Sequence, residues 1–305
     1  MKAVYFMQNG GPEVLQYGEQ PDPVAAEGQV VVDIHAASVN GADWKTRSGY
    51  HAPTKKFPHI PGRDFSGIVS AVGQGVTEFK IGDEVFGVSV HTDEGCYAGK
   101  VAINAAIVRK KPAQFSHLEM AAVGLTGLTA IVSIETALQV KAGQTVLVQG
   151  GAGGVASFGL QIAKHLGARV ITTCSAGNAD YVKSLGADQV IDYNKEDFSK
   201  VLKDCDAVFD TVGGEVAKNA FKVLRRGGRA AFINGPAPTP PYEDMASLKP
   251  DATRKRVHLD RIASLLSSGA VKLPQITTYA LADAQAAHRV SEGRHLRGKL
   301  VFKVR

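Results

Sequence analysis

The segment from Thr145 to Val155, with the sequence TVLVQGGAGGV, constrains the fold of this chain more than any other. It begins as an apolar strand, turns at a run of glycines and continues with helical spacing. Glycines at such a turn let the main chain approach a phosphate group closely, and the start of the helix offers free N–H groups. The pattern G-x-G-x-x-A is short, so its meaning depends on this strand–turn–helix order. We predict a dinucleotide-binding turn made of Gly150, Gly151, Ala152, Gly153, Gly154 and Val155.

The residues after this turn continue to alternate between strand and helix patterns. Helices are expected at 155–166, 179–185, 196–202 and 215–224, and strands at 169–174, 189–193, 207–210 and 229–234. Alternation at this spacing predicts a parallel sheet with helices on both faces. Gly167, Gly186 and Gly227 follow helical patterns, where a left-handed residue commonly ends a helix. The second half of the chain is therefore predicted to be an α/β domain with a doubly wound parallel sheet of the Rossmann type.

The N-terminal part has a different pattern. Short strand-like runs at 28–35 and 65–72 are separated by turn residues, which predicts a compact β-barrel as far as about Val108. The tail, from about Leu273, returns to strand character and is expected to rejoin this barrel. We predict two domains: a barrel domain of residues 1–112, rejoined by about 270–305, and a Rossmann domain of residues 113–269.

Composition and charge limit the class of protein. Of the 305 residues, 44% are hydrophobic and 21% are charged, as in globular proteins. No apolar run approaches the roughly 20 residues of a membrane span, and the N-terminus lacks the apolar core of a secretory signal. Three widely spaced cysteines cannot form a disulfide framework, so we expect a reducing, cytoplasmic compartment. The net charge of +6 comes from mostly scattered residues, and specific nucleic-acid binding is not expected.

Several motifs, in this order along the chain, resemble the medium-chain dehydrogenase/reductase superfamily. They are AASVNGAD at 36–43, PGRDFSGIV at 61–69, GDEVFG at 82–87, GLTGLTA at 124–130, QGGAGGVA at 149–156 and RGKLVF at 297–302. The resemblance covers nearly the whole chain. Within the superfamily, the chain resembles the zinc-independent quinone oxidoreductase branch. The segments DWK at 43–45 and CSAGN at 174–178 resemble the chloroplast-envelope and alkenal/enone reductase members of that branch. The resemblance implies a GroES-like barrel domain joined to an NAD(P)-binding Rossmann domain.

The same resemblance indicates that the chain holds no zinc. Zinc enzymes of the superfamily carry a cysteine where this chain has Asn40, a histidine where it has Arg63, and a second cysteine at Val123–Gly124. An arginine and an amide cannot replace imidazole and thiolate as zinc ligands. Without a metal to polarise the substrate, the enzyme needs an acceptor that is already reactive toward hydride.

The function implied by the resemblance is NADPH-dependent reduction of quinones or α,β-unsaturated carbonyls. The family further implies a homodimer. Two other classes of function stay open on the sequence alone. One is a non-catalytic protein that senses nucleotides on the same fold, and the other is a protein that binds single-stranded RNA through its basic surface.

Four residues on the acceptor side are predicted from the resemblance. Asn40 is expected near the nicotinamide and the acceptor, with capping of a turn as its alternative role. Lys45 is expected to donate to a carbonyl oxygen, or else to be a solvated surface lysine. Tyr50 is expected in the loop that borders the substrate. Thr126 is expected to meet the nicotinamide, or to cap a helix.

The choice of cofactor depends on the end of the second Rossmann strand. Enzymes that use NAD generally place an acidic residue there, whereas this chain has Thr173, Cys174 and Ser175. Ser175 can hydrogen-bond a 2′-phosphate, so NADPH is preferred to NADH as the expected cofactor. Beside Thr173 and Ser175, the further cofactor-binding residues expected at the strand ends are Asn178, Tyr193, Thr211, Asn234 and Gly235.

Overall fold

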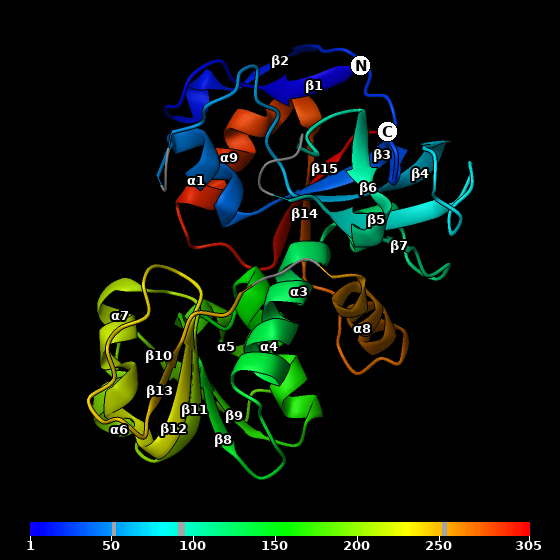
Figure 1. Cartoon of the computed structure of the whole chain (residues 1–305). Helices are drawn as coiled ribbons and strands as arrows, with labels where there is room; N and C mark the ends of the chain where they lie inside the picture. The colour runs from blue at the N-terminus through cyan, green and yellow to red at the C-terminus, as the bar shows by residue number, and fades with distance from the viewer. Residues whose placement is uncertain (51–52, 91–94, 252–254) are drawn as a thin grey trace. The chain divides into compact units, whose positions relative to one another are not determined.

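The computed structural model describes residues 1–50, 53–90, 95–251 and 255–305. The chain forms two compact units (Figure 1). The first comprises Met1–Leu125, Arg254–Ala263 and Gln275–Arg305, and we call it the barrel domain. The second comprises Thr126–Thr253 and Ser264–Pro274, and we call it the Rossmann domain. The predicted fold class, a GroES-like barrel domain with a Rossmann domain, is confirmed.

The barrel domain is built on a large, mostly antiparallel sheet. Its strands are β3 (Gln29–Val39), β4 (Asp64–Val72), β5 (Glu84–Val88), β6 (Lys100–Asn104), β7 (Val108–Lys110), β14 (Ile276–Ala280) and β15 (Lys299–Lys303), in the order β14-β15-β3-β4-β5-β7, with β6 also paired to β3. Strands β1 (Lys2–Tyr5) and β2 (Gln16–Glu19) form a separate pair. The C-terminal tail thus returns to this sheet, since β15 pairs antiparallel with β3.

The barrel domain also contains the helices α1 (Gly41–Ser48), α2 (His117–Ala121) and α9 (Ala284–Glu292). Helix α2 lies against β3 and β4, so the first unit extends to Leu125, beyond the predicted boundary at residue 112. The core of this unit is formed by side chains such as Val32, Phe65 and Phe302, which the alternation of strand residues directs inward.

The Rossmann domain has a fully parallel sheet. Its strands are β8 (Thr145–Val148), β9 (Arg169–Cys174), β10 (Gln189–Asp192), β11 (Cys205–Asp210), β12 (Leu224–Phe232) and β13 (Ala246–Leu248), in the order β10-β9-β8-β11-β12-β13. This is the doubly wound order in which the chain starts at the centre of the sheet and proceeds first to one edge and then to the other. The carboxyl ends of the strands therefore meet at one edge of the sheet.

The helices of this half are α3 (Gly124–Ile131), α4 (Gly154–His165), α5 (Ala179–Ser184), α6 (Phe198–Val201) and α7 (Gly214–Asn219), and helices lie on both sides of the sheet (Figure 1). A π-helical stretch, Val132–Ala137, follows α3, and α8 (Arg256–Ser267) is divided between the two units at Ala263. Within the residues that the structure describes, no helix is both long and apolar enough to cross a bilayer.

The predicted helix at 215–224 and strand at 229–234 are partly wrong. Helix α7 ends at Asn219, and β12 begins already at Leu224. Gly227 has a φ of 71°, but it lies within β12 and not at the end of a helix. The register between β11 and β12 shifts there, so the residues around Gly227 bulge out of the ladder. Strand β13 was not predicted, because three half-buried residues between two loops leave little pattern.

Candidate functional site

The turn between β8 and α4 brings two stretches of main chain close together. A Cβ atom on Gly151 would lie 2.1 Å from Oγ1 of Thr172, and that hydroxyl is held in place because it donates to the carbonyl of Val148 at 2.6 Å. Gly150 has a φ of 73°, a left-handed conformation that favours glycine. The turn therefore requires glycine at both positions, and at these positions its outer surface consists of main-chain atoms.

Several N–H groups of the turn donate to acceptors within the protein itself. The N–H of Gly150 donates to Oγ1 of Thr173 at 3.0 Å, and the N–H of Gly151 donates to the Thr173 carbonyl at 3.0 Å. The N–H of Gly153 donates to the Gly150 carbonyl at 2.9 Å. These groups are used within the protein, so the donors for an anion are those of the first turn of α4, beginning at Gly154 and Val155. Ala152 is buried inside the turn.

Three predicted residues meet at the carboxyl ends of β9 and β10. Ser175 begins a short 3₁₀ turn, and its hydroxyl accepts a hydrogen bond from the side-chain amide of Asn178 at 3.2 Å. Tyr193 follows β10, and its N–H donates to the Cys174 carbonyl at 3.3 Å, which places it beside Ser175. The Tyr193 side chain is 49% exposed. The three side chains form a polar edge with an accessible ring and no carboxylate among them.

The ends of β11 and β12 add a second polar group to the same edge of the sheet. Thr211 donates through Oγ1 to the Gln149 carbonyl at 2.8 Å, which ties it to the glycine turn. Asn234 donates to the Val212 carbonyl at 2.5 Å, and Gly235 follows it with a φ of 85°. All the predicted cofactor-binding residues thus lie along the carboxyl edge of one sheet.

Asp210, at the end of β11, fixes the loop that follows this strand. Its Oδ1 accepts hydrogen bonds from the N–H groups of Val212 at 3.1 Å and Gly213 at 2.7 Å. Burial raises the pKa of Asp210 to about 6, against these two bonds, which lower it. The carboxylate therefore holds the loop that Asn234 also contacts.

In the barrel domain, Asn40 immediately precedes α1, and its side chain belongs to a buried network. Its amide nitrogen donates to Oδ2 of Asp64 at 2.9 Å, and its amide oxygen accepts from Nζ of Lys299 at 2.7 Å. Lys299 also donates to the Val39 carbonyl at 2.8 Å. Burial lowers the pKa of Lys299, while the carboxylate of Asp64 opposes this shift. The sequence offered no sign of this network, because its members lie on different strands.

The other three predicted acceptor-side residues are not part of this network. Lys45 and Tyr50 lie together: the Lys45 ammonium is 5.5 Å from the centre of the Tyr50 ring. Tyr50 is 59% exposed. Thr126 is buried in α3, in the other unit. The roles of Asn40, Lys45, Tyr50 and Thr126 toward an acceptor stay predictions.

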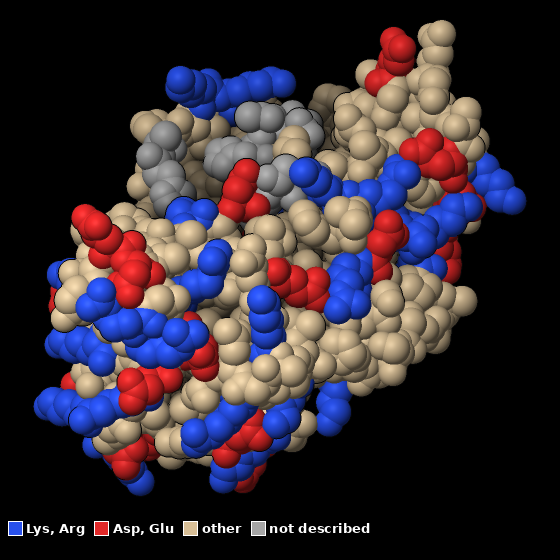
Figure 2. Space-filling view, turned by 60° about the horizontal axis from the view of Figure 1, so that its bottom comes forward, with Lys and Arg blue, Asp and Glu red and all other residues tan. Residues whose placement is uncertain are grey.

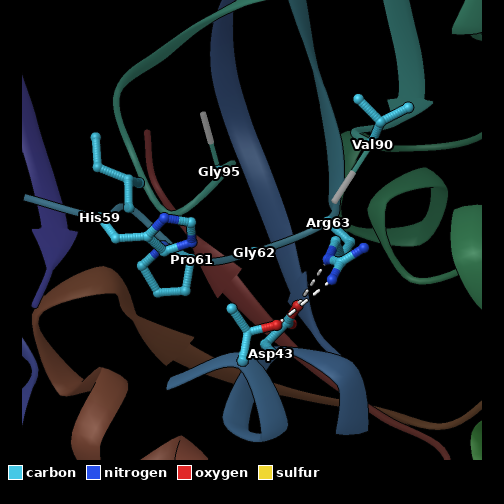
Figure 3. A pocket seen from close by; sticks show the side chains of 9 residues that line it. Asp43, His59, Pro61, Gly62, Arg63, Val90 and Gly95 are labelled. Carbon is cyan, nitrogen blue, oxygen red and sulfur yellow. Dashed lines mark hydrogen bonds and ion pairs between the residues drawn. The ribbon is translucent and has the colours of Figure 1, made fainter. Parts of the chain in front are cut away.

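A small cavity in the barrel domain is lined by residues that include Arg63 and Asp43. Figure 3 shows Arg63 and Asp43 pointing toward each other in it, with Nε of Arg63 4.0 Å from Oδ1 of Asp43. The Asp43 carboxylate is buried, which raises its pKa to about 6 although Arg63 acts in the opposite direction. The cavity measures about 10 Å³, roughly the space of one water molecule, so it cannot hold a quinone. In the part of the chain that the structure describes, no three His, Cys, Asp or Glu side chains are grouped to bind a metal.

Two family models match the chain. The alcohol dehydrogenase GroES-like domain matches residues 26–113, and the zinc-binding dehydrogenase domain matches residues 185–302. A 2-methylene-furan-3-one reductase from Solanum lycopersicum is 38% identical over 79% of this chain, which spans 64% of that relative. A chloroplast envelope quinone oxidoreductase homolog from Arabidopsis thaliana is 30% identical, with 98% of this chain and 97% of the relative covered.

Solved structures of quinone oxidoreductases are also similar to this chain. The quinone oxidoreductase from Coxiella burnetii has a TM-score of 0.89 at 34% identity, covering 100% of this chain and 99% of that one. The Escherichia coli quinone oxidoreductase complexed with NADPH has a TM-score of 0.90 at 30% identity, with 100% of both chains covered. The chain therefore belongs to the medium-chain dehydrogenase/reductase superfamily, in its branch of quinone and enone oxidoreductases.

Proposed function

We propose that this protein is an NADPH-dependent oxidoreductase that reduces quinones or α,β-unsaturated carbonyl compounds. The observation that carries the proposal is the glycine turn of the Rossmann domain, in which a Cβ atom at Gly151 would meet Thr172 at 2.1 Å. This close packing leaves the first turn of α4 open to a pyrophosphate. The relatives named above are a 2-methylene-furan-3-one reductase and a quinone oxidoreductase homolog, and one solved quinone oxidoreductase is in complex with NADPH.

Within this proposal, residues of the Rossmann domain are assigned to each part of NADPH. The N–H groups at Gly154 and Val155 would hold the pyrophosphate, at the positive end of the α4 dipole. Ser175 and Asn178 would hydrogen-bond the 2′-phosphate, and the exposed ring of Tyr193 would lie along the adenosine. Thr211, Asn234 and Gly235 would face the nicotinamide half. When bound, NADPH supplies a hydride to the acceptor.

We further propose that the reaction needs no zinc. The family resemblance assigns Arg63 and Asn40 to the positions of two zinc ligands. Both side chains contact carboxylates, since Arg63 faces Asp43 and Asn40 donates to Asp64. Hydride transfer without a metal requires an acceptor whose product charge is delocalised, as in a hydroquinone anion or an enolate. Within this proposal, Lys45 or Thr126 would donate a hydrogen bond to the acceptor oxygen.

The RNA-binding alternative finds no support on the surface shown in Figure 2, where basic and acidic side chains are interspersed. Ion pairs of the Rossmann domain have the same character, for example Lys164–Asp188 at 2.6 Å and Arg225–Asp206 at 2.6 Å. A homodimer and a cytoplasmic location also belong to the proposal. Light scattering and cell fractionation test them.

The first experiment is NADPH oxidation, followed by the loss of absorbance of the reduced nicotinamide. The acceptors are a naphthoquinone, phenanthrenequinone, a 2-alkenal and a vinyl ketone. Rapid turnover of any of them supports the proposal and identifies the acceptor class. Binding of NADPH without turnover of any acceptor would favour the nucleotide-sensing alternative.

A pair of variants tests the nucleotide site separately. Gly153→Glu places a carboxylate at the start of α4, at a position with an ordinary φ of −74°, and should abolish NADPH binding. Gln144→Glu adds the same charge just before the amino end of β8, where the side-chain oxygen accepts a bond from Lys141 N–H, and serves as the matched control. NADPH affinity is measured by fluorescence titration. Unchanged affinity in Gly153→Glu would refute the assignment of the glycine turn.

A further inference from the structure

An aromatic and cationic cluster lies around Trp44 in α1 of the barrel domain. The rings of Trp44 and Tyr50 have centres 6.2 Å apart and meet at 71°. Nζ of Lys45 is 5.6 Å from the centre of the Trp44 ring and 5.5 Å from that of Tyr50. Cζ of Arg294, beyond the end of α9, is 5.7 Å from the Trp44 ring. We call Trp44, Lys45, Tyr50 and Arg294 the Trp44 cluster.

The Trp44 cluster is open to solvent. Tyr50 is 59% exposed, Arg294 is exposed, and Trp44 and Lys45 are half-buried. Each cation therefore lies near an aromatic ring and remains within reach of solvent. A ligand at this surface meets a ring to stack on and two positive charges within a few ångströms of it.

Carboxylates that neighbour the cluster along the chain are directed elsewhere. Asp43 is buried and accepts a hydrogen bond from the hydroxyl of Tyr97 at 2.9 Å. Glu292 forms an ion pair with the buried guanidinium of Arg47. Both of these carboxylates are thus bound toward the interior of the barrel domain.

The backbone at Arg294 is unusual. Its φ is 56°, in the left-handed region where glycine or asparagine is common and arginine is rare. Gly293, the preceding residue, has an ordinary φ of −64°. An arginine in a strained conformation persists only where the surroundings hold it, and here its guanidinium lies by Trp44. Glycine would adopt this backbone conformation more easily than arginine. We therefore infer that the charged side chain of Arg294 has a function at this surface.

We propose that the Trp44 cluster selects acceptors that are flat aromatic rings bearing a negative charge, such as a quinone with a sulfonate or carboxylate group. The ring of the acceptor stacks on the exposed ring of Tyr50 and meets Trp44 edge to face, while the anionic group pairs with the guanidinium of Arg294 and the ammonium of Lys45. A neutral acceptor keeps the stacking and loses the ion pair. This inference rests on the proposed function, because it names the class of acceptor which that reaction uses.

Trp44 is the only tryptophan of the chain, so its fluorescence reports directly on the cluster. The full-length protein, without NADPH, is titrated with anthraquinone-2-sulfonate and with anthraquinone-2-sulfonamide, its neutral counterpart. The sulfonate should bind about five to ten times more tightly at low salt, as expected for two exposed ion pairs, and most of this preference should disappear at 0.5 M NaCl. Equal affinities, or no change in Trp44 fluorescence, would overturn the proposal.

A pair of variants locates the preference. Arg294→Gln should weaken sulfonate binding about threefold and leave sulfonamide binding unchanged, since one exposed ion pair is lost. Lys303→Gln removes the same charge from an exposed residue of β15 and should change neither affinity. Equal effects of the two variants would mean that the net charge of the protein, and not the Trp44 cluster, causes the preference. The titration contains no NADPH, so it does not depend on turnover. If no acceptor of the NADPH-oxidation assay is reduced but the preference for the sulfonate is retained, the reductase function is rejected and the role of the Trp44 cluster in binding is not.

Discussion

The buried histidine His288 should make the barrel domain lose stability in mild acid. Its Nδ1 is 3.1 Å from a guanidinium nitrogen of Arg47, and its Nε2 is 3.3 Å from the hydroxyl of Tyr97. Burial, and then the charge of Arg47, lower the pKa of His288 from 6.5 to about 3. The folded protein therefore keeps this imidazole neutral in a range where the unfolded chain protonates it.

The sign and size of the effect follow from this difference in pKa. Between pH 6.5 and 3 the unfolded state binds more protons than the folded state, so stability falls as the pH falls. At pH 5, which is about 1.5 units below the pKa of histidine in the unfolded chain, protonation stabilises the unfolded state by about 2 kcal/mol relative to the folded state. The buried carboxyl of Asp43 acts in the opposite direction, because its pKa is raised to about 6, and this contribution is common to the wild type and a His288 variant.

The variant His288→Asn tests the argument. The Asn side-chain oxygen can replace Nδ1 as an acceptor for Arg47, and it does not titrate. The loss of unfolding free energy between pH 7 and pH 5 should shrink by about 2 kcal/mol relative to the wild type. Urea unfolding followed by Trp44 fluorescence measures this, because Trp44 lies in the same unit. His295→Asn, at an exposed position, is the control. The same loss in His288→Asn and the wild type would refute the reasoning.

Three further predictions concern residues of the two domains. Gly151→Ala should lower the free energy of unfolding by about 1–3 kcal/mol and NADPH affinity at least tenfold, because its Cβ would lie 2.1 Å from Oγ1 of Thr172; unchanged urea and fluorescence titrations would contradict this. Ser175→Asp should reduce the ratio of NADPH to NADH affinity, measured by fluorescence titration, since a carboxylate repels a 2′-phosphate; an unaltered ratio would remove Ser175 from the phosphate site. Asn40→Ala should cost about 2–3 kcal/mol of unfolding free energy in urea, because it removes the hydrogen bonds of the amide to buried Lys299 and buried Asp64, and a cost near zero would show that water replaces the amide.

The nucleotide half of the fold could be predicted because its signals are local. The strand, turn and helix from Thr145 to His165 are contiguous, and the glycine requirement at Gly151 follows from one short turn. Most strands that follow begin and end within two residues of their predicted bounds, because each is a short apolar run between loops. The prediction failed at β12, where a bulge around Gly227 belongs to the strand and depends on pairing with β11.

The contacts of the barrel domain could not be predicted because they join distant parts of the chain. Arg294 approaches Trp44 from the other end of the sequence, and His288 reaches Arg47 in the same way. Each pair depends on α9 lying beside α1, which no local pattern encodes. The sequence indicated that Lys45 and Tyr50 could border an acceptor, but it could not show that an arginine from the tail shares the surface with them.

The network around Asn40 gives its amide a structural role that does not depend on which quinone or enone the protein reduces. Lys299 is buried on β15 and donates to Asn40 and to the Val39 carbonyl, while Asp64 is buried on β4 and accepts from Asn40 and from the hydroxyl of Ser38. An asparagine supplies both an acceptor and a donor from one side chain, with its oxygen 2.7 Å from Nζ of Lys299 and its nitrogen 2.9 Å from Oδ2 of Asp64. An aspartate would offer no donor and would add a second carboxylate next to Asp64, and a cysteine is too weak an acceptor for a buried lysine. One amide at the strand-to-helix junction between β3 and α1 thus links the buried charges of β4 and β15.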